Sequence, residues 1–453
     1  MSKHKAPVVG PLALKFQHPK IEYLPIEKLR PAKRNPRTHS KKQTEKLYAI
    51  IRQFGFINPI IIADNGTIIA GHLRFQVAKL MQLVEVPVIR IQHLTDAEKR
   101  SFALAENRVA QDAGTDPQLL HAEILELTVE LPKENIDIAV TGYEIAEIDT
   151  ALMNFEEPSQ STAADELPAP GPKVSKPGDL WLMGDHRLSQ TDARDSAAYA
   201  ALMRDERAAM TITDPPYNVS ILSHARGRSK KQFAEFPMAS GELNDAGFIT
   251  FLTQWLGCVV QVSKDGAIIY VFIDWPHIGH LLKAGAEVCA ELKNICVWVK
   301  SNGGQGSFYR SQHELVAVFK NGTAPHINTF QLGQHGRTRT NVWRYAGVNS
   351  FKAGRNDELN MHPTVKPVRM IVDAMLDCSS RGSIVLDPFM GSGSSIIAGE
   401  TVGRRVYGME LDPEYVDVAI RRWQRFTGRD AILESTGQTF AEVQSARAPT
   451  IPA

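Results

Sequence analysis

Short apolar runs rich in β-branched residues recur through the second half of the chain, and they constrain its fold more than any other feature. Stretches with helical spacing, such as Ala246–Val262 and Pro367–Asp377, lie between most of them. Buried strands that alternate with helices predict a doubly wound α/β sheet, in which ligands bind at the carboxyl ends of the strands. The runs are Met210–Thr213, Ala267–Ile273, Asn294–Val299, Leu315–Phe319, Ser383–Leu386 and Arg405–Glu410.

A segment of different composition separates this part of the chain from the first. Residues 156–178 contain five prolines and almost no large apolar side chain, which is typical of a semi-extended linker between domains. The α/β domain is therefore expected over residues 179–428. The last stretch, residues 429–453, is polar and ends in APTIPA, so we expect a weakly ordered tail.

The first part of the chain predicts a smaller α+β domain over residues 21–112. Two β-rich runs, 60–63 and 67–70, flank the turn signal Asn65-Gly66. Gly71 opens a helix that reaches Met81, and a strand over 85–91 and a helix over 96–111 follow. We expect residues 1–20 to form an N-terminal tail and residues 113–155 an acidic helical extension.

A net charge of +1 hides a strong asymmetry along the chain. Residues 1–60 hold 13 Lys and Arg against 3 Asp and Glu, whereas residues 96–168 hold 4 against 17. The basic arm indicates either an anionic partner such as nucleic acid or a merely solvated surface. The longest apolar stretch, Ala267–Ile273, is far too short to cross a bilayer. Four cysteines without CxxC spacing suit a reducing compartment, so a cytoplasmic protein without membrane partners is expected.

Residues 387–394, DPFMGSGS, form a turn that follows a strand and precedes a helix. Gly391 and Gly393 would let the backbone approach a ligand, and the helix start offers free N–H groups. The next strand ends in Glu410, whose carboxylate could accept both hydroxyls of a ribose. The spacing matches neither GxGxxG nor GxxxxGK[ST], so a nucleoside ligand is favoured over NAD or ATP.

A second turn, Asp214-Pro215-Pro216-Tyr217, also follows a strand. Its two prolines fix the backbone, and Asp214 and the carbonyl of Pro215 would be two acceptors side by side. Such acceptors suit an exocyclic amine on a nucleobase, whose lone pair is delocalised until its N–H bonds are held. Tyr217 could stack on a base turned out of the duplex. This chemistry needs no metal; the alternative is a proline-stiffened surface turn.

Residues 178–428 resemble the amino-group DNA methyltransferases, which modify adenine N6 or cytosine N4. Asp214–Tyr217 match the catalytic DPPY of that family, and the block 295–321 resembles the one that lines its target-base pocket. The catalytic motif precedes the cofactor motif, as in the beta class. The resemblance implies a Rossmann-like fold and S-adenosyl-L-methionine as cofactor. It further implies cofactor contacts from Asp387, Pro388, Phe389, Gly391, Gly393, Glu410, from Thr364 and Lys366 of the HPTVKP element, and from Asp192.

Residues 324–360 are expected to recognise the DNA target, because cations alternate with aromatic side chains there. A second basic loop, residues 226–231, follows the catalytic turn. The DNA contacts are assigned to Arg226, Arg228, Arg337, Arg339 and Arg344. A solvated loop is the alternative in both places.

Residues 21–112 resemble the ParB-like (ParB/sulfiredoxin) domain through the pieces NPR at 35–37, GFINPI at 55–60, AGHLR at 70–74 and AENR at 105–108. Gly71, His72 and Arg74 would form an anion site at a helix start. The chain has one Arg where partition proteins carry two, and it lacks the sulfiredoxin cysteine. Docking or DNA holding is therefore preferred over CTP binding, which stays open.

The sequence thus predicts a ParB-like module fused to a methyltransferase of double-stranded DNA, as in restriction–modification systems, and leaves open whether the chain forms a homodimer. Adenine N6 is preferred because DPPY is commoner among the adenine enzymes of the family. The alternatives are cytosine N4, an RNA base, a protein amide, or a DNA-binding regulatory protein with a vestigial methylase.

Overall fold

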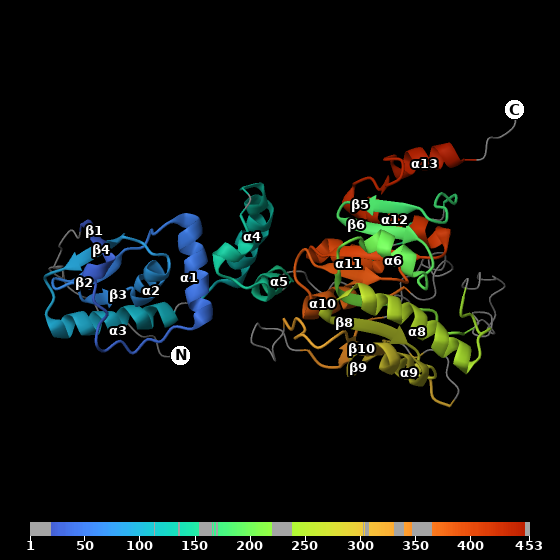
Figure 1. Ribbon diagram of the computed structural model, residues 1–453, viewed down its shortest axis with the longest axis horizontal. Helices are drawn as coiled ribbons and strands as arrows, with labels where there is room; N and C mark the ends of the chain where they lie inside the picture. Colours follow the sequence, from blue (N-terminus) through green and yellow to red (C-terminus); the bar gives the residue numbers. More distant parts are fainter. Residues whose placement is uncertain are drawn as a thin grey trace, which may run out of the picture. The chain divides into compact units, whose positions relative to one another are not determined.

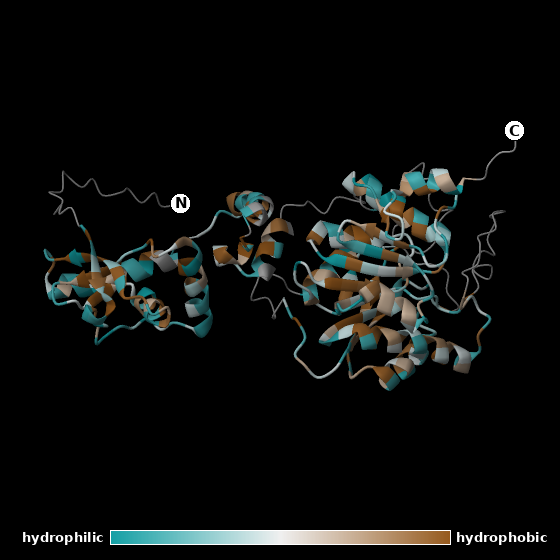
Figure 2. Cartoon of the chain, turned by 45° about the horizontal axis from the view of Figure 1, so that its top comes forward, coloured by the Kyte–Doolittle hydropathy of each residue, from teal (hydrophilic) through white to brown (hydrophobic). Residues whose placement is uncertain are grey.

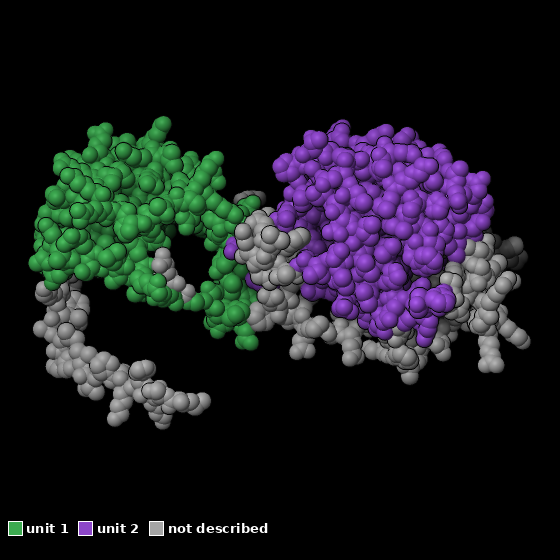
Figure 3. Space-filling view, turned by 90° about the horizontal axis from the view of Figure 1, so that it is seen from below, with its two compact units in different colours: residues 1–144 green, residues 145–453 purple. Residues whose placement is uncertain are grey.

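The computed structural model divides the chain into two compact units, residues 1–144 and 145–453 (Figure 3). No helix among the described residues is both long and apolar enough to span a membrane. The structure describes residues 20–112, 114–134, 136–153, 165, 167–168, 171–219, 238–301, 303, 308–329, 339–346 and 365–448.

The first unit is built on a four-stranded sheet with the order β1-β4-β2-β3. Gly66 closes the turn between β2 and β3 with φ 79°, and an added Cβ would lie 2.5 Å from the carbonyl oxygen of Lys28, so glycine is required there. The unit combines this sheet with helices, as the predicted α+β domain requires. The elements are β1 (Ile21–Pro25), α1 (Lys41–Phe54), β2 (Ile60–Ala63), β3 (Ile68–Ala70), α2 (His72–Leu80), β4 (Glu85–Ile91), α3 (Asp96–Asp112) and α4 (Pro117–Glu130).

The second unit contains a mixed sheet with the order β11-β9-β10-β8-β7-β12-β13-β6-β5-β14 across its described residues. Strands β8, β7, β12, β13 and β6 run parallel, which confirms the predicted doubly wound α/β fold. Antiparallel partners extend the sheet on both sides. The strands are β5 (Leu180–Met183), β6 (His186–Gln190), β7 (Ala208–Thr213), β8 (Ser263–Ile273), β9 (Glu291–Val299), β10 (His313–Lys320), β11 (Val342–Arg344), β12 (Ile384–Asp387), β13 (Arg405–Glu410) and β14 (Ile432–Leu433).

Helices cover both faces of this sheet (Figure 1). One face packs on α6 (Ser196–Met203), α8 (Asp245–Val262) and α9 (Ile278–Val288), and the other on α10 (Val368–Cys378), α11 (Ser394–Val402) and α12 (Pro413–Thr427). Alternate residues of one strand enter the two cores, since β8 sends Ile269 to the first and Tyr270 to the second. Hydrophobic residues accordingly concentrate on the strands and inner helix surfaces (Figure 2).

The predicted C-terminal tail is wrong over most of its length. After Gly428 the chain forms β14, which pairs with β5, and then helix α13 (Phe440–Arg447). Phe440 is buried with its ring 5.2 Å from that of Trp181. Arg447 donates to Asp179 at the start of the unit. The α/β unit therefore includes residues up to 448, and polarity misled the prediction because a single apolar stripe anchors α13.

The α/β unit also begins earlier than residue 179. The carboxylate of Asp417 on α12 accepts hydrogen bonds from the backbone N–H of Val174, at 2.6 Å, and from the N–H and hydroxyl of Ser175, at 3.0 and 2.6 Å. Val174 and Ser175 are buried. The end of the predicted linker is thus part of the packed unit, because its backbone donors satisfy a buried carboxylate.

Helix α5 (Ile145–Met153), which lies in the predicted acidic extension, is likewise part of this unit. Its buried Asp149 receives a hydrogen bond from Arg404, whose side chain is fully buried, at 2.9 Å, and pairs with Arg381 at 3.2 Å. Removing one partner of such a buried ion pair lowers the free energy of unfolding by several kcal/mol, because the remaining charge is left buried and uncompensated. Residues 145–153 therefore stabilise the α/β unit.

Candidate active site

A cavity opens at the carboxyl ends of the neighbouring strands β7, β12 and β13. Both turns singled out in the sequence line it, one after β7 and one after β12. This is the edge at which a parallel sheet places its ligands. The lining includes Thr191, Ala193, Asp214, Pro215, Pro216, Tyr217, Phe272, Lys366, Asp387, Pro388, Phe389, Gly391, Ser392, Ser394, Ser395, Glu410 and Tyr415.

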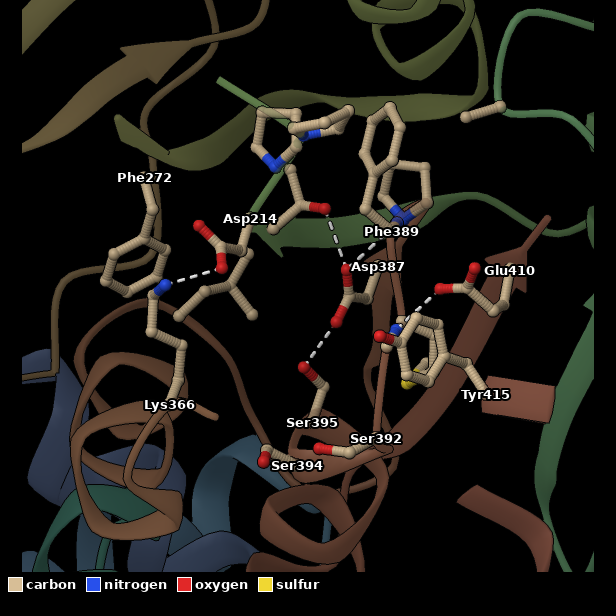
Figure 4. Close-up of a pocket in the computed structure, with 18 of the residues that line it drawn as sticks. Asp214, Phe272, Lys366, Asp387, Phe389, Ser392, Ser394, Ser395, Glu410 and Tyr415 are labelled. Atoms are coloured by element: carbon tan, nitrogen blue, oxygen red, sulfur yellow. Dashed lines mark hydrogen bonds and ion pairs between the residues drawn. The ribbon is translucent and has the colours of Figure 1, made fainter. Parts of the chain in front are cut away.

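Asp214 belongs to a cluster of opposite charges in which Lys366 is buried and the other members are partly buried. Its Oδ2 lies 2.5 Å from Nζ of Lys366, and its Oδ1 accepts a hydrogen bond from the hydroxyl of Tyr217. Lys366 Nζ also lies 3.2 Å from Oε2 of Glu314, and Glu314 is held from its other oxygen by Lys300 at 2.5 Å. Figure 4 shows Lys366 pointing at Asp214 within the cavity. Two carboxylates and two ammonium groups thus compensate one another.

The two carboxylates of this cluster have opposite pKa shifts. Burial raises the pKa of Asp214, although Lys366 opposes the effect. Burial would also raise the pKa of Glu314, but Lys366 and Lys300 outweigh it and lower that pKa. Lys366 itself stays charged because the two carboxylates raise its pKa against the cost of burial.

The Asp387 turn is fixed by its own side chain. One oxygen of the Asp387 carboxylate accepts from the Thr213 hydroxyl at 2.7 Å and from the backbone N–H of Phe389 at 3.2 Å. The other accepts from the Ser395 hydroxyl at 2.5 Å (Figure 4). These bonds tie β7 to β12 and hold the turn at the start of α11. Burial raises the pKa of Asp387 to about 6.

Glu410, at the end of β13, presents its carboxylate to the same cavity. Its two oxygens accept from the backbone N–H groups of Gly391, at 2.8 Å, and Asp412, at 2.9 Å. Each oxygen retains a further lone pair that a ligand hydroxyl can use. Burial raises the pKa of Glu410 to about 7. Tyr415, which was not singled out from the sequence, lies beside it (Figure 4).

Two residues assigned to the cofactor, Asp192 and Gly393, do not line the cavity, and a third, Lys366, lines it but is engaged by two carboxylates. Asp192 does not line the cavity; Arg194 binds its carboxylate at 2.6 Å, and its neighbours Thr191 and Ala193 line the cavity instead. Gly393 serves packing, because an added Cβ would lie 2.8 Å from Cβ of Ala419. Lys366 faces Asp214 and Glu314. Thr364 lies outside the described residues.

Of the residues assigned to DNA, Arg339 is corrected by the structure. Its guanidinium binds Asp377 at 3.0 Å and the hydroxyl of Tyr345 at 2.9 Å, so it anchors the segment before β11 to α10. Arg344 is exposed on β11. Arg226, Arg228 and Arg337 lie outside the described residues, as does most of the region 324–360.

The three residues of the expected anion site are mainly engaged within the first unit. Gly71 begins α2 with φ 99°. Arg74 donates to the carbonyl of Pro59 at 2.9 Å, and burial lowers the pKa of His72, whose Nε2 accepts from the N–H of Ala32 at 3.2 Å. The arrangement holds the start of α2 against the preceding loops.

Sequence reasoning missed Glu314 and Lys300 as members of the site. Both lie in the block that resembles the family's base pocket, but nothing in their spacing distinguishes them from surface charges. Only the antiparallel pairing of β10 with β8 and β9 brings them beside Asp214. An isolated carboxylate inside an apolar strand, HELVAVF, was the available signal.

Comparison with known families finds three matching domains. The DNA methylase family of the N6/N4 type matches residues 208–421, the ParB N-terminal domain matches 12–108, and the ParB-methyltransferase HTH domain matches 118–177. The last match spans both the predicted acidic extension and the predicted linker, where no helix-turn-helix was expected from the sequence.

Two curated relatives and one solved structure are similar to parts of this chain. The ParB-like nuclease domain-containing protein YnaK of Escherichia coli (strain K12) is 44% identical over 81 residues, which are 18% of this chain and 93% of YnaK. The type II methyltransferase M.HpaI of Haemophilus parainfluenzae is 26% identical over 242 residues, 50% of this chain and 71% of M.HpaI. The crystal structure of the M1.HpyAVI–SAM complex is 18% identical, with a TM-score of 0.39, over 52% of this chain and 97% of that one.

Proposed function

We propose that this chain, which belongs to the ParB-like domain family and carries a DNA methylase domain of the N6/N4 type, methylates the N6 amino group of adenine in double-stranded DNA. S-adenosylmethionine-dependent methylation of an amino group in DNA is the activity of that methylase family. The finer assignment concerns which base enters the cavity and which residues act on it.

The observation that carries the proposal is the position of Asp214. Its carboxylate, bound by Tyr217 and Lys366, faces the cavity whose other side carries Glu410 and the Asp387 turn. An exocyclic amine placed there would find acceptors in Asp214 and in the carbonyl of Pro215. Holding both N–H bonds localises the nitrogen lone pair, and the fixed turn orients it, which is the main catalytic contribution available without a covalent intermediate.

The residues on the far side fit the cofactor. Glu410 is a buried carboxylate with one free lone pair on each oxygen, which suits the two hydroxyls of a ribose. Phe389, Tyr415 and Gly391 line the remaining wall. When bound, S-adenosylmethionine supplies an electrophilic methyl group on a sulfonium. The chain orients the amine toward it and excludes water with Phe272 and the prolines.

Tyr217 has two proposed tasks. Its hydroxyl donates to Asp214 and therefore keeps that carboxylate in one orientation. Its ring is available for stacking on an extruded base. Because Asp214 lies within the cavity, the target nucleotide must leave the duplex to reach it.

Long-read sequencing that detects modified bases tests the proposal. DNA from cells that express the chain should carry N6-methyladenine at one recurrent sequence, and DNA from cells that express Asp214→Ala should not. N4-methylcytosine at a recurrent sequence would assign the alternative base. Unmodified DNA, together with S-adenosylmethionine binding by the purified protein, would favour a regulatory protein with a vestigial methylase.

A further inference from the structure

Two exposed aromatic side chains, Phe308 and Tyr309, stand on the loop that joins β9 to β10. Phe308 is 85% exposed and Tyr309 81%, and their ring centroids are 4.6 Å apart. We propose that this pair, the aromatic rim, enters the base stack of the DNA duplex at the place that the target nucleotide leaves. The inference rests on the proposed function in one respect, that the substrate is duplex DNA.

The loop leaves the sheet at the edge that holds the active site. Strand β8 runs parallel to β7 and antiparallel to β10, and β10 is antiparallel to β9, so β9 ends at the same edge as β7. The base of the loop joins the charge cluster directly, because Lys300 binds Glu314 at 2.5 Å and Glu314 shares Lys366 with Asp214. The aromatic rim therefore stands at the same edge of the sheet as the Asp214 turn.

Hydrogen bonds close the neck of the loop. The N–H of Lys300 donates to the carbonyl of Gln312 at 2.9 Å, and the side chain of Gln312 donates back to the carbonyl of Lys300 at 3.0 Å. Phe308 is four residues beyond this neck, so it can reach at most about 14 Å from it. Two exposed rings a few residues from a hydrogen-bonded base suit insertion between bases.

Exposed aromatic residues gather at this edge. Among the described residues of the second unit, Trp275, Phe308, Tyr309 and Phe426 are the aromatic side chains with large exposure. Trp275 follows the end of β8, so three of the four stand at the catalytic edge. Phe426 is the penultimate residue of α12, a helix that begins after β13 and runs back toward the opposite edge.

The composition of the loop favours a nucleic acid over a protein as the partner. Residues 300–312, KSNGGQGSFYRSQ, contain no carboxylate, and Arg310 follows the two rings, so the loop can approach phosphates. Two rings among Gly, Ser, Asn and Gln form too small an apolar patch for a stable protein interface. They match one or two bases, on which aromatic stacking contributes roughly 1–3 kcal/mol each.

The gap that the target nucleotide leaves in the base stack explains why such contacts would be useful. Turning one nucleotide out of the stack costs a few kcal/mol, and the cost is lowest when the base is already mispaired. An aromatic side chain that fills the gap offsets part of this cost and slows the return of the base. The aromatic rim should therefore matter most when the target base starts out paired.

The experiment compares two duplexes that carry the recognition sequence found by sequencing. In one the target base is paired, and in the other it lies opposite an abasic site. Phe308→Ala with Tyr309→Ala should lower kcat/KM on the paired duplex by roughly ten- to a hundredfold, as expected for the loss of one to two stacking contacts. On the abasic duplex the same variant should stay within about threefold of the wild type. Phe308→Trp should keep activity on both duplexes.

Phe426→Ala is the matched control, since it removes an exposed ring from the opposite edge and should change neither rate. Equal losses on both duplexes, or no loss on either, would overturn the role of the aromatic rim. Failure of the proposed function looks different, because the wild-type protein would then either methylate neither duplex or place the methyl group on cytosine. S-adenosylhomocysteine affinity, measured by calorimetry, should be the same in every variant and shows that the cavity is intact.

Discussion

Nζ of Lys366 lies 2.5 Å from Oδ2 of Asp214, although 152 residues separate them in the chain. Lys366 was expected to contact the cofactor, but it stands between the carboxylates of Asp214 and Glu314 with 7% of its side chain exposed. The ammonium group thus allows two acids to be buried next to each other. It keeps Asp214 available as an acceptor by opposing the effect of burial on the pKa of that carboxyl.

Replacing Lys366 by Met should therefore damage both stability and catalysis. Removing one partner of a buried ion pair costs roughly 3–5 kcal/mol, and urea denaturation should show a loss of that size. Activity should fall at least a hundredfold, whereas affinity for S-adenosylhomocysteine should change less than threefold. A loss confined to cofactor affinity would restore the original assignment. Adding Glu314→Gln to the Met variant should recover part of the stability, because it removes the negative charge that stands next to the unpaired Asp214.

Asp214→Ala should abolish methyl transfer and leave the cofactor bound. A lost transition-state contact of this kind costs roughly a hundredfold or more. Glu410 and the Asp387 turn lie on the other side of the cavity and keep their hydrogen bonds. Single-turnover rates and calorimetric affinity should be measured on the same preparation. Residual activity above about a tenth of wild type would remove Asp214 from the catalytic role.

Cofactor affinity should depend on pH through Glu410, whose pKa burial raises to about 7 from an ordinary value of 4.5. The hydroxyls of a ribose donate to the ionised carboxylate, so affinity should fall as the pH drops below about 7, by roughly ten- to a hundredfold in all. The contribution of Glu410 to the stability of the ligand-free protein changes with pH in the opposite direction. The raised pKa means that the contribution of this group is complete below about pH 4.5 and is lost as the pH rises through about 7.

Calorimetric titration of S-adenosylhomocysteine at several pH values checks this, with Glu410→Gln as the comparison. The Gln variant should bind S-adenosylhomocysteine more weakly than the wild type at pH 8. Its affinity should also no longer fall as the pH drops through about 7. If the affinity of the Gln variant still falls by the full amount around pH 6, the assignment of the pH dependence to Glu410 is wrong. The titrating group would then be Asp387, whose pKa is raised to about 6 by burial.

The C-terminal segment should be required for stability. Phe440→Ala removes a buried ring packed on Trp181 and should cost roughly 3–5 kcal/mol in the free energy of unfolding. Truncation after Gly428 should cost more, because the pairing of β14 and the Arg447–Asp179 ion pair disappear as well. Phe426→Ala, at a site with 41% exposure, should cost about 1 kcal/mol or less. Unchanged denaturation midpoints in the truncated protein would contradict this account.

The ParB-like unit is expected to add phosphate contacts through its basic arm. Full-length protein should then show a steeper log–log dependence of DNA affinity on salt than residues 145–453 alone, because each contact releases counterions. The shorter chain should start at Ile145 rather than near Lys176, since α5 supplies Asp149 to buried Arg404 and the stretch before Lys176 supplies Val174 and Ser175 to Asp417. Equal salt slopes would mean that the first unit docks on something other than DNA.

The local sequence pattern was sufficient to predict those strands and helices whose hydrophobic residues match the faces that they bury. The strands of the central sheet, such as β7 and β12, are apolar on both faces and could be read directly. Strand β1 and helix α1 could not, because β1 has alternating exposed residues and α1 is mostly polar. Ser40 and Gln43 form a capping box that marks the start of α1, and this was the signal that was overlooked.

The class of sheet, the two turns that line the cavity and a nucleoside ligand could be predicted from residues close together in the chain, and short motifs carried the resemblances that imply the cofactor and the ParB-like module. The tertiary structure decided which charges meet. Lys366, Glu314 and Lys300 surround Asp214, Arg339 is anchored to α10, and Asp417 ties the end of the expected linker to α12. These contacts join residues tens to hundreds of positions apart. Only the strand order and the packing of helices on the sheet bring them within hydrogen-bonding distance.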